Sequence, residues 1–188
     1  MAAVLPFSDE ISNLLYAAHG SPIQTCIQCG TCSGTCPVAG FMDHTPRRLI
    51  AMIRADLKDE VLASNTYWFC ASCFHCNARC PRDIDIAGMM YGLKRYSMWK
   101  GRFKEGLVGP VFSETFVKTI MRTGRSYEPI LAPSYMPSLG GLRELFQEAV
   151  TATGLMLKGR LPLLPPRIKR LEKFRQVVGR ILPIGGAQ

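Results

Sequence analysis

The fold of this chain is decided by two stretches of sequence, Cys26-Ile-Gln-Cys29-Gly-Thr-Cys32-Ser-Gly-Thr-Cys36-Pro37 and Cys70-Ala-Ser-Cys73-Phe-His-Cys76-Asn-Ala-Arg-Cys80-Pro81. Both stretches read C-x2-C-x2-C-x3-C-P, and together they contain all 8 cysteines of the 188-residue chain. A spacing that is repeated, and that is followed each time by proline, predicts two similar ligand sites around which the remaining residues are organised.

This spacing is typical of four thiolates that hold a cubane 4Fe–4S cluster. The first three cysteines of a run can surround one cluster, because each thiolate meets a different iron. The proline after the fourth cysteine has no N–H and disfavours a helical conformation of the residue before it, so that thiol turns away from its own triplet. In two-cluster ferredoxins the fourth cysteine binds the other cluster. We therefore predict two 4Fe–4S clusters, one held by Cys26, Cys29, Cys32 and Cys80, the other by Cys70, Cys73, Cys76 and Cys36.

Zinc and disulfides are the competing interpretations of these cysteines. Structural zinc also takes four cysteines, but usually as two C-x2-4-C pairs with a loop between them, which these dense runs fit poorly. A disulfide framework needs an oxidising compartment, and no export signal indicates one. His75 lies inside the second run, but four cysteines already complete each site, so we do not expect it to be a ligand.

Composition favours a cytoplasmic protein with one domain and an extension. Hydrophobic residues make up 47% of the chain, which is enough for a core. The start, Met1-Ala-Ala-Val-Leu, does not read as a secretory signal, and no stretch approaches the roughly 18 apolar residues of a membrane span.

The basic charge of the chain does not by itself indicate nucleic acid. The formal charge of +9 falls to roughly +5 once two clusters of about −2 each are counted. No nucleic-acid-binding motif accompanies this charge, so we expect no nucleic acid partner. An acidic protein partner, or the charge of the clusters themselves, explains the basic residues better.

Helical periodicity outside the runs predicts an all-α fold. We expect helices over residues 8–19, from Pro46 to about Leu57, and over 59–63, 84–99, 111–123, 141–157 and 167–182. The second has Thr45 as its N-cap and Pro46 in its first turn. Its apolar residues are Leu49, Ile50, Ile53 and Leu57, and those of the helix at 84–99 are Ile86, Met89, Met90, Leu93 and Tyr96. Arg47, Arg48, Arg54 and Lys58 lie off the apolar face, as a solvated surface or as a docking surface for a redox partner.

Several residues in and beside the runs are expected to serve the clusters. Gly30 and Gly34 can accept positive φ where the backbone wraps a cluster, although they could equally serve the turn alone. Tyr67, Trp68 and Phe69 precede the second run and are expected to keep water from a cluster. Arg79 and Arg82 flank Cys80, where they either favour the reduced cluster or are simply exposed.

Beyond Gly124 the character of the sequence changes. Prolines interrupt any regular pattern at positions 129, 133, 137, 162, 165, 166 and 183. We therefore divide the chain into an alpha-helical dicluster ferredoxin domain at 1–125 and a Pro-rich, basic, partly helical extension at 126–188. The helix expected at 167–182 is basic and amphipathic, so it could lie on a membrane surface or on a partner. The extension has so little core of its own that we expect it to wrap a partner.

The absence of other motifs narrows the chemistry. The sequence has no G-x-G-x-x-G, no P-loop and no H-E-x-x-H, which leaves no indication of a nucleotide, flavin or catalytic zinc site. Every cysteine is assigned to a cluster, so no thiol remains as a nucleophile and we name no catalytic residue. Whether the chain is an enzyme in its own right stays open. A chain with this chemistry alone is expected to carry electrons one at a time between other sites.

These residues resemble the C subunits of heterodisulfide reductase and its relatives. The resemblance covers roughly residues 20–130 and rests on the two cysteine runs with Thr45-Pro46-Arg47-Arg48-Leu49-Ile50, Trp68-Phe69-Cys70-Ala-Ser-Cys73, Cys80-Pro81-Arg82-Asp83-Ile84-Asp85-Ile86 and Gly124-Arg125-Ser126-Tyr127-Glu128. It implies an all-helical ferredoxin fold like the cluster domain of succinate dehydrogenase iron–sulfur subunits.

The resemblance also implies two partner subunits. One is a cysteine-rich B-type catalytic subunit that reduces a disulfide, and the other is a flavin-containing A-type subunit, with electrons passing between them through this chain. The substrate would be the mixed disulfide of coenzymes M and B in methanogens, and other sulfur compounds in related bacterial complexes. The long basic extension departs from the shortest family members, so the host pathway stays open.

Two other functions compete with this hypothesis. The chain could be the iron–sulfur subunit of another dehydrogenase, acting on glycerol-3-phosphate, lactate or succinate, and co-purifying subunits would discriminate between the two. It could also be a zinc-stabilised binding module without a redox role. Metal content would reveal that module, because zinc is colourless and does not change valence.

Overall fold

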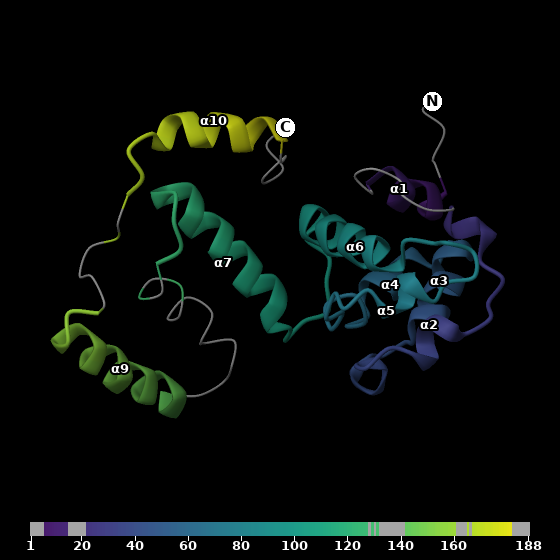
Figure 1. Cartoon of the computed structure of the whole chain (residues 1–188), viewed down its shortest axis with the longest axis horizontal. Helices are drawn as coiled ribbons and strands as arrows, with labels where there is room; N and C mark the ends of the chain where they lie inside the picture. Colours follow the sequence, from purple (N-terminus) through teal and green to yellow (C-terminus); the bar gives the residue numbers. More distant parts are fainter. Residues whose placement is uncertain are drawn as a thin grey trace. The chain divides into compact units, whose positions relative to one another are not determined.

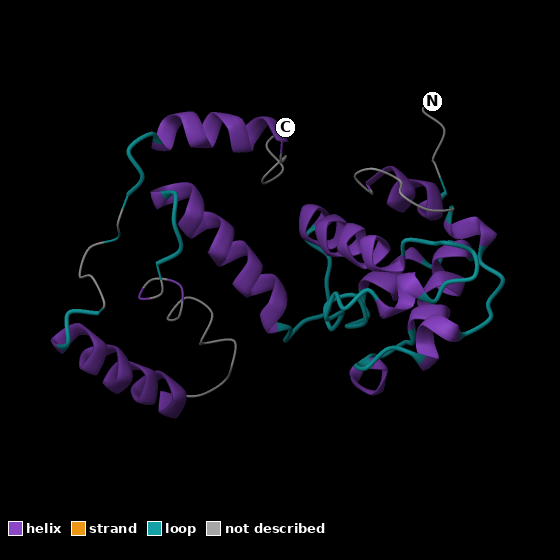
Figure 2. Cartoon of the chain, in the orientation of Figure 1, coloured by secondary structure: helices purple, strands orange, loops and turns teal. Residues whose placement is uncertain are grey.

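The computed structural model describes residues 6–14, 22–127, 142–160 and 167–181, together with residues 129, 131 and 165. Within these residues the regular elements are helices, and no strand is found, as the sequence predicts (Figure 2). Contacts divide the chain into two units, Met1–Glu105 and Gly106–Gln188. The division predicted from proline content, between residues 125 and 126, falls one helix later.

The first unit contains the cysteine runs (Figure 1). Its helices are α1 (Phe7–Leu14), α2 (Thr31–Gly34), α3 (Pro46–Arg54), α4 (Lys58–Leu62), α5 (His75–Ala78) and α6 (Ile86–Lys100), with 3-10 turns η1 (Ile23–Thr25) and η2 (Ala39–Phe41). The predicted helices correspond to α1, α3, α4 and α6, whereas α2 and α5 were not predicted, because a single turn carries no helical periodicity. The expected continuation of α1 to His19 and its stop at Gly20 lie outside the described residues.

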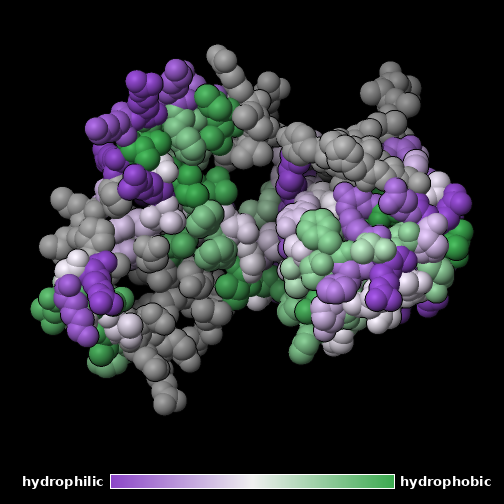
Figure 3. All heavy atoms as spheres, in the orientation of Figure 1, coloured by the Kyte–Doolittle hydropathy of each residue, from purple (hydrophilic) through white to green (hydrophobic). Residues whose placement is uncertain are grey.

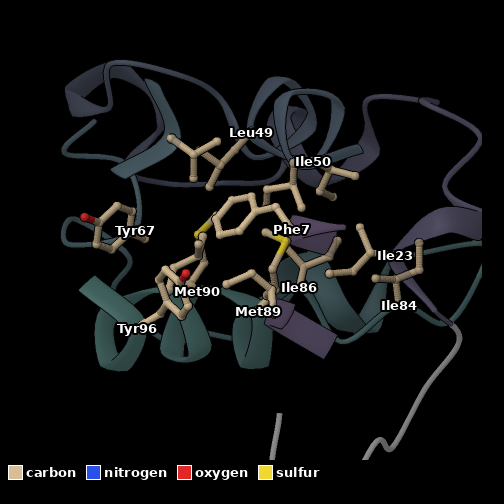
Figure 4. Close-up of a cluster of buried hydrophobic side chains, with 14 of the residues drawn as sticks. Phe7, Ile23, Leu49, Ile50, Tyr67, Ile84, Ile86, Met89, Met90 and Tyr96 are labelled. Atoms are coloured by element: carbon tan, nitrogen blue, oxygen red, sulfur yellow. The ribbon is translucent and has the colours of Figure 1, made fainter. Parts of the chain in front are cut away.

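The core of this unit lies between α1, α3, α4 and α6. Figure 4 shows Phe7 of α1 among side chains of α3 and α6, with Leu49 and Ile50 on one side of its ring and Met89 and Met90 on the other. The predicted apolar stripes of α3 and α6 are confirmed, since Leu49, Ile50, Ile53, Ile86, Met89, Met90, Leu93 and Tyr96 are all buried. Burying a side chain of this size contributes about 1.5–3 kcal/mol. The exception is Leu57, which is 41% exposed because α3 already ends at Arg54.

The core also positions the cysteines. Cys32 is part of the buried cluster of hydrophobic side chains, and four other cysteines pack against it: Cys26, Cys70, Cys76 and Cys80. Both runs are therefore anchored on the same set of apolar side chains. A substitution in this core should therefore shift the positions of the cysteines in both runs.

Polar contacts fix α1 on the rest of the unit. The Glu10 carboxylate accepts hydrogen bonds from Lys58 Nζ at 2.8 Å and from the Tyr96 hydroxyl at 2.6 Å. The N–H of Phe7 donates to Asp56 Oδ1 at 2.8 Å. These contacts join α1 to α4, to α6 and to the turn after α3.

The second unit contains α7 (Val108–Thr123), α9 (Leu142–Leu157) and α10 (Leu171–Ile181). Helix α7 ends where predicted, because Gly124 takes a left-handed conformation with φ +79° as its C-cap. Arg175 of α10 then donates to the carbonyls of Met121, at 2.7 Å, and Arg122, at 3.3 Å. In this way α10 satisfies carbonyls that the end of α7 leaves free.

Apolar side chains remain on the surface of the second unit. On α9, Phe146 is 74% exposed and Leu157 is 85% exposed, and hydrophobic surface is visible over this helix (Figure 3). Among the described residues, no helix is both long enough and apolar enough to cross a membrane.

Candidate metal centres

The two cysteine runs share one backbone conformation. Gly30 and Phe74, at equivalent positions, have φ +82° and +58°, and each is followed directly by a short helix, α2 or α5. Gln28 and Ser72, also equivalent, have φ +58° and +55°. Gly30 thus has the positive φ that was predicted, whereas Gly34 ends α2 without it, which leaves for Gly34 the alternative that it serves the turn alone. The repeat in the sequence is thus a repeat in structure, kept even where a non-glycine residue must adopt the left-handed region.

The first hollow is surrounded by three thiols of the first run and the last thiol of the second. Its lining includes Cys26, Cys29, Cys32 and Cys80, and it encloses about 340 Å³, open solvent included. Ile50, Ile84 and Ile86 form apolar parts of the wall, whereas Arg47 and Arg82 add charge. Arg54 also donates to the carbonyl of Cys26 at 2.7 Å, which holds the start of the run on α3.

The second hollow has the reciprocal set of thiols. Its lining includes Cys70, Cys73, Cys76 and Cys36, and it encloses about 370 Å³, open solvent included. The remaining wall carries no charged side chain among the described residues and consists of Val38, Met42, Pro46, Ala71, Phe74, Ala87 and Met90. Each predicted set of four thiols therefore meets at one hollow.

The thiols at both hollows suit a metal–sulfur group. All eight cysteines are free of disulfides. Thiolate is a soft ligand that selects iron–sulfur clusters or zinc. Among the described residues, no three Cys, His, Asp or Glu side chains converge on a point that could hold a single ion. In a cubane cluster the four thiolates bind four separate irons, so they surround a volume rather than a point.

The two hollows are neighbours. Helices α2 and α5, which carry Cys32 and Cys76, contact each other. Burial raises the pKa of the Cys76 thiol to about 11, and the nearby thiols of Cys70 and Cys32 contribute to this shift. Cys32 is itself buried, which raises the pKa of its thiol. The innermost thiol of each run is therefore close to the other run.

Hydrogen-bond donors surround the sulfurs of the first hollow. Gln28 Nε2 lies 3.5 Å from Cys26 Sγ, and the hydroxyl of Thr31 lies 3.4 Å from Cys29 Sγ. The N–H of Ile84 donates to Cys80 Sγ at 3.4 Å. The hydrogen bond from Thr31 is the main reason why the pKa of the Cys29 thiol lies below its ordinary value. At Cys32, a hydrogen bond from Ser33 opposes the rise in pKa that burial causes.

The second hollow is arranged differently. The sulfur of Cys76 faces the side-chain oxygen of Asn77 at 3.5 Å, and that oxygen accepts the N–H of Ala87 at 2.8 Å. Asn77 Nδ2 donates to Asp85 at 2.6 Å, and the same carboxylate caps α6 by accepting the N–H of Gly88 at 2.8 Å. This network fixes α5 on the start of α6. It places an acceptor, rather than a side-chain donor, beside the sulfur of Cys76.

Several residues highlighted in the sequence lie elsewhere. Tyr67 is buried in the core and its hydroxyl donates to the carbonyl of Leu62 at 2.9 Å, while Phe69 is 42% exposed. Neither they nor Trp68 are among the residues lining the two hollows, although Trp68 packs on the same core as Cys70, so the shielding of a cluster by these aromatics stays a prediction. Arg82 lines the first hollow, whereas Arg79 and His75 line neither. The sequence reasoning missed Gln28, Thr31 and Phe74, although their places inside the runs were a signal.

Comparison with known proteins finds relatives that match the region of the two cysteine runs. Residues 22–84 match the family described as 4Fe-4S dicluster domain. The chain is 37% identical over 81 residues to the C subunit of H(2):CoB-CoM heterodisulfide,ferredoxin reductase from Methanothermobacter marburgensis, covering 43% of this chain and 44% of the relative. It is 36% identical over 94 residues to the C subunit of ferredoxin:CoB-CoM heterodisulfide reductase from Methanosarcina mazei, covering 50% and 57%.

A third relative agrees with these two. The iron-sulfur C subunit of CoB–CoM heterodisulfide reductase from Methanopyrus kandleri is 34% identical over 99 residues, covering 50% of this chain and 52% of the relative. The matches thus span about half the length of the curated relatives. In its iron–sulfur region, the chain is similar to the C subunits of heterodisulfide reductases and carries a match to the 4Fe-4S dicluster domain.

Proposed function

We propose that this chain is the electron-transfer iron–sulfur subunit of a heterodisulfide-reductase-like complex. The observation that carries the proposal is the meeting of three thiols from one run with the fourth thiol of the other, at each of two neighbouring hollows. We assign Cys26, Cys29, Cys32 and Cys80 to one 4Fe–4S cluster and Cys70, Cys73, Cys76 and Cys36 to the other. Such clusters, when bound, supply one-electron transfer without proton or group transfer.

The protein's part in this function is to hold the two groups close together in a partly dry site. Packing of α2 against α5 brings the two hollows together, which shortens the path of an electron between them. Apolar walls exclude water, for example Ile84 and Ile86 at the first hollow and Met90 at the second. Cys29 and Cys73 are the exposed thiols of the two sets, so each site also has a side that a redox partner can approach.

The proposal includes two partner subunits and no catalytic residue in this chain. The names of the relatives describe heterodisulfide and ferredoxin reduction, which this chain would serve by linking a flavin-containing subunit to a cysteine-rich catalytic subunit. The basic helix α10 and the residues around it would wrap one of these partners. We place this complex in the cytoplasm, where free thiols and iron–sulfur clusters are maintained.

Metal content and EPR spectroscopy test the redox role. Protein purified without oxygen should contain about eight irons and about eight sulfides per chain, and dithionite should produce the spectrum of two interacting reduced clusters. Zinc near stoichiometry, with no EPR signal even after attempted cluster reconstitution, would overturn the proposal. Co-purification of a flavin subunit and a cysteine-rich subunit tests the complex separately, and other dehydrogenase subunits in their place would contradict it.

A further inference from the structure

We infer that the site at the first hollow, made by Cys26, Cys29, Cys32 and Cys80, holds the more easily reduced of the two clusters, and that donors to its sulfurs cause the difference. The inference rests on the proposed function, since it concerns the order in which the two clusters accept electrons. It concerns residues that are not ligands, above all Gln28 and Thr31.

The first argument is the hydrogen bonding of the sulfurs. Reduction adds negative charge to a cluster and its ligands, so a donor directed at sulfur stabilises the reduced state more than the oxidised state. At the first hollow three of the four thiols have such a donor: Gln28 for Cys26, Thr31 for Cys29 and the N–H of Ile84 for Cys80.

The second hollow lacks this pattern. Within the described residues, no side chain donates a hydrogen bond to the sulfur of Cys36, Cys70 or Cys73, and the donors to Cys76 are two backbone N–H groups, those of Asn77 and of Cys76 itself. The side-chain oxygen of Asn77 faces the same sulfur and opposes added negative charge there. Trp68 has a buried indole N–H without a partner, but this residue does not line the hollow.

The second argument is the distribution of charge, which also favours reduction of the cluster at the first hollow. Arg47 and Arg82 line the first hollow, and Arg54 donates to the carbonyl of Cys26. At the second hollow the corresponding contact is a single lysine, Lys94, which donates to the carbonyl of Cys70 at 3.3 Å. Positive charge stabilises the reduced cluster, although solvent and salt weaken the effect of exposed arginines.

The consequence is a direction for the one-electron step inside the chain. When one electron is available, the cluster at the second hollow is oxidised as the cluster at the first hollow is reduced, and the electron comes to rest at the first. The next electron acceptor is then reduced by the cluster at the first hollow, and the cluster at the second hollow passes electrons to the first.

A matched pair of threonine variants tests this inference in the full-length, cluster-loaded protein. In an EPR-monitored redox titration, Thr31→Val should lower the midpoint potential of the higher-potential wave and leave the lower wave in place. Thr35→Val is the control, because its hydroxyl lies in the same helix region but donates to the carbonyl of Thr31 at 2.9 Å, not to a sulfur. Movement of the lower wave, of both waves or of neither in Thr31→Val would overturn the inference, as would an equal shift in Thr35→Val.

Arg82→Gln is a second variant for the case in which Thr31→Val does not bind its clusters. Arg82 is exposed and lines the first hollow, so the substitution removes charge without opening the core. The higher wave should again move down, and high salt should shrink the shift. A downward shift of the lower wave would overturn the inference. Protein that contains zinc and shows no redox wave at all would instead contradict the proposed function, so the two failures are distinguishable.

Discussion

The two cysteine runs have the same spacing and the same backbone, yet their surroundings differ. Gly30 and Phe74 occupy the same left-handed position, and α2 and α5 follow at the same place. The side chains between the ligands are not equivalent: Thr31 offers a hydroxyl to a sulfur where the second run has His75, and Ser33 stands where the second run has Asn77. The comparison teaches that cysteine spacing determines which thiols meet, while the residues between and around them determine how each site behaves.

Replacing the fourth cysteine of either run by serine should give the largest effect, the loss of one whole cluster. If the reciprocal assignment holds, Cys36→Ser loses the cluster at the second hollow and Cys80→Ser loses the one at the first, each with about half of the iron. Iron analysis measures the loss, and Thr31→Val identifies the survivor. That substitution should shift the remaining potential in the Cys36→Ser background and not in the Cys80→Ser background. The reverse result would show that each run binds its own fourth cysteine.

The carboxylate of Asp85 should matter to the second hollow more than to the first. It caps α6 and holds Asn77, so Asp85→Ala removes an N-cap, which costs about 1 kcal/mol, and also removes the partner of the Asn77 amide. We expect a total loss of about 1–2 kcal/mol in the free energy of unfolding. With a chelator present, the second-hollow cluster should be lost first.

The control for this variant is another aspartate in the same unit. Asp59 pairs with Arg102 at 2.7 Å, but both side chains are largely exposed, so Asp59→Ala should change stability little. If Asp85→Ala lost its two clusters at equal rates, as Asp59→Ala should, the network at Asp85 would not be specific to one hollow.

Much of this arrangement could be predicted from the sequence, because it depends on period and spacing. The buried stripe of α6 follows from the spacing of Ile86, Met89 and Leu93, and the grouping of thiols follows from the cysteine spacing. Positions that depend on three-dimensional neighbours could not be predicted. Leu57 is apolar but lies beyond the end of α3, and Tyr67 is fully buried in the core.

The places of Gln28 and Thr31 inside the first run were a signal, but a linear pattern does not show which sulfur a donor meets. Gln28 and Thr31 approach the sulfurs because the backbone between the cysteines turns through positive φ at Gln28 and Gly30. The N–H of Ile84 reaches Cys80 only through the turn after the second run. Spacing therefore predicts the ligands, but the chemical difference between the two sites depends on the three-dimensional surroundings of each sulfur.

Glu10 provides a test that should affect the two hollows equally, because α1 lines neither of them. Hydrogen bonds from Lys58 and Tyr96 hold the pKa of Glu10 below its ordinary value of 4.5. A carboxylate with a lowered pKa stabilises the fold above its unfolded-state pKa, and this contribution is lost as pH falls through the folded-state pKa. Glu10→Gln should therefore cost about 1 kcal/mol in the free energy of unfolding near pH 7, and the difference should vanish in acid.

Thermal or denaturant unfolding, followed by circular dichroism across pH, measures this difference. Glu114→Gln is the matched control, because Glu114 pairs with Lys118 on an exposed face of α7, where an ion pair contributes little. A pH-independent loss in Glu10→Gln would mean that packing, and not charge, holds α1 in place. If Glu10→Gln lost one cluster before the other during unfolding, the core would not support both runs equally.

The smallest expected effects separate charge from hydrogen bonding in the comparison of the two hollows. Arg82→Gln should lower the potential at the first hollow and Lys94→Gln the potential at the second, each by about 20 mV, the one-electron equivalent of roughly 0.5 kcal/mol. The Arg82→Gln shift should shrink most at high salt, because Arg82 is exposed and Lys94 is half-buried, whereas the shift caused by Thr31→Val should persist. If Lys94→Gln instead widened the gap between the two waves by more than Arg82→Gln narrowed it, charge would favour reduction at the second hollow. The donors at the first hollow would then have to outweigh that charge for the proposed order of reduction to hold.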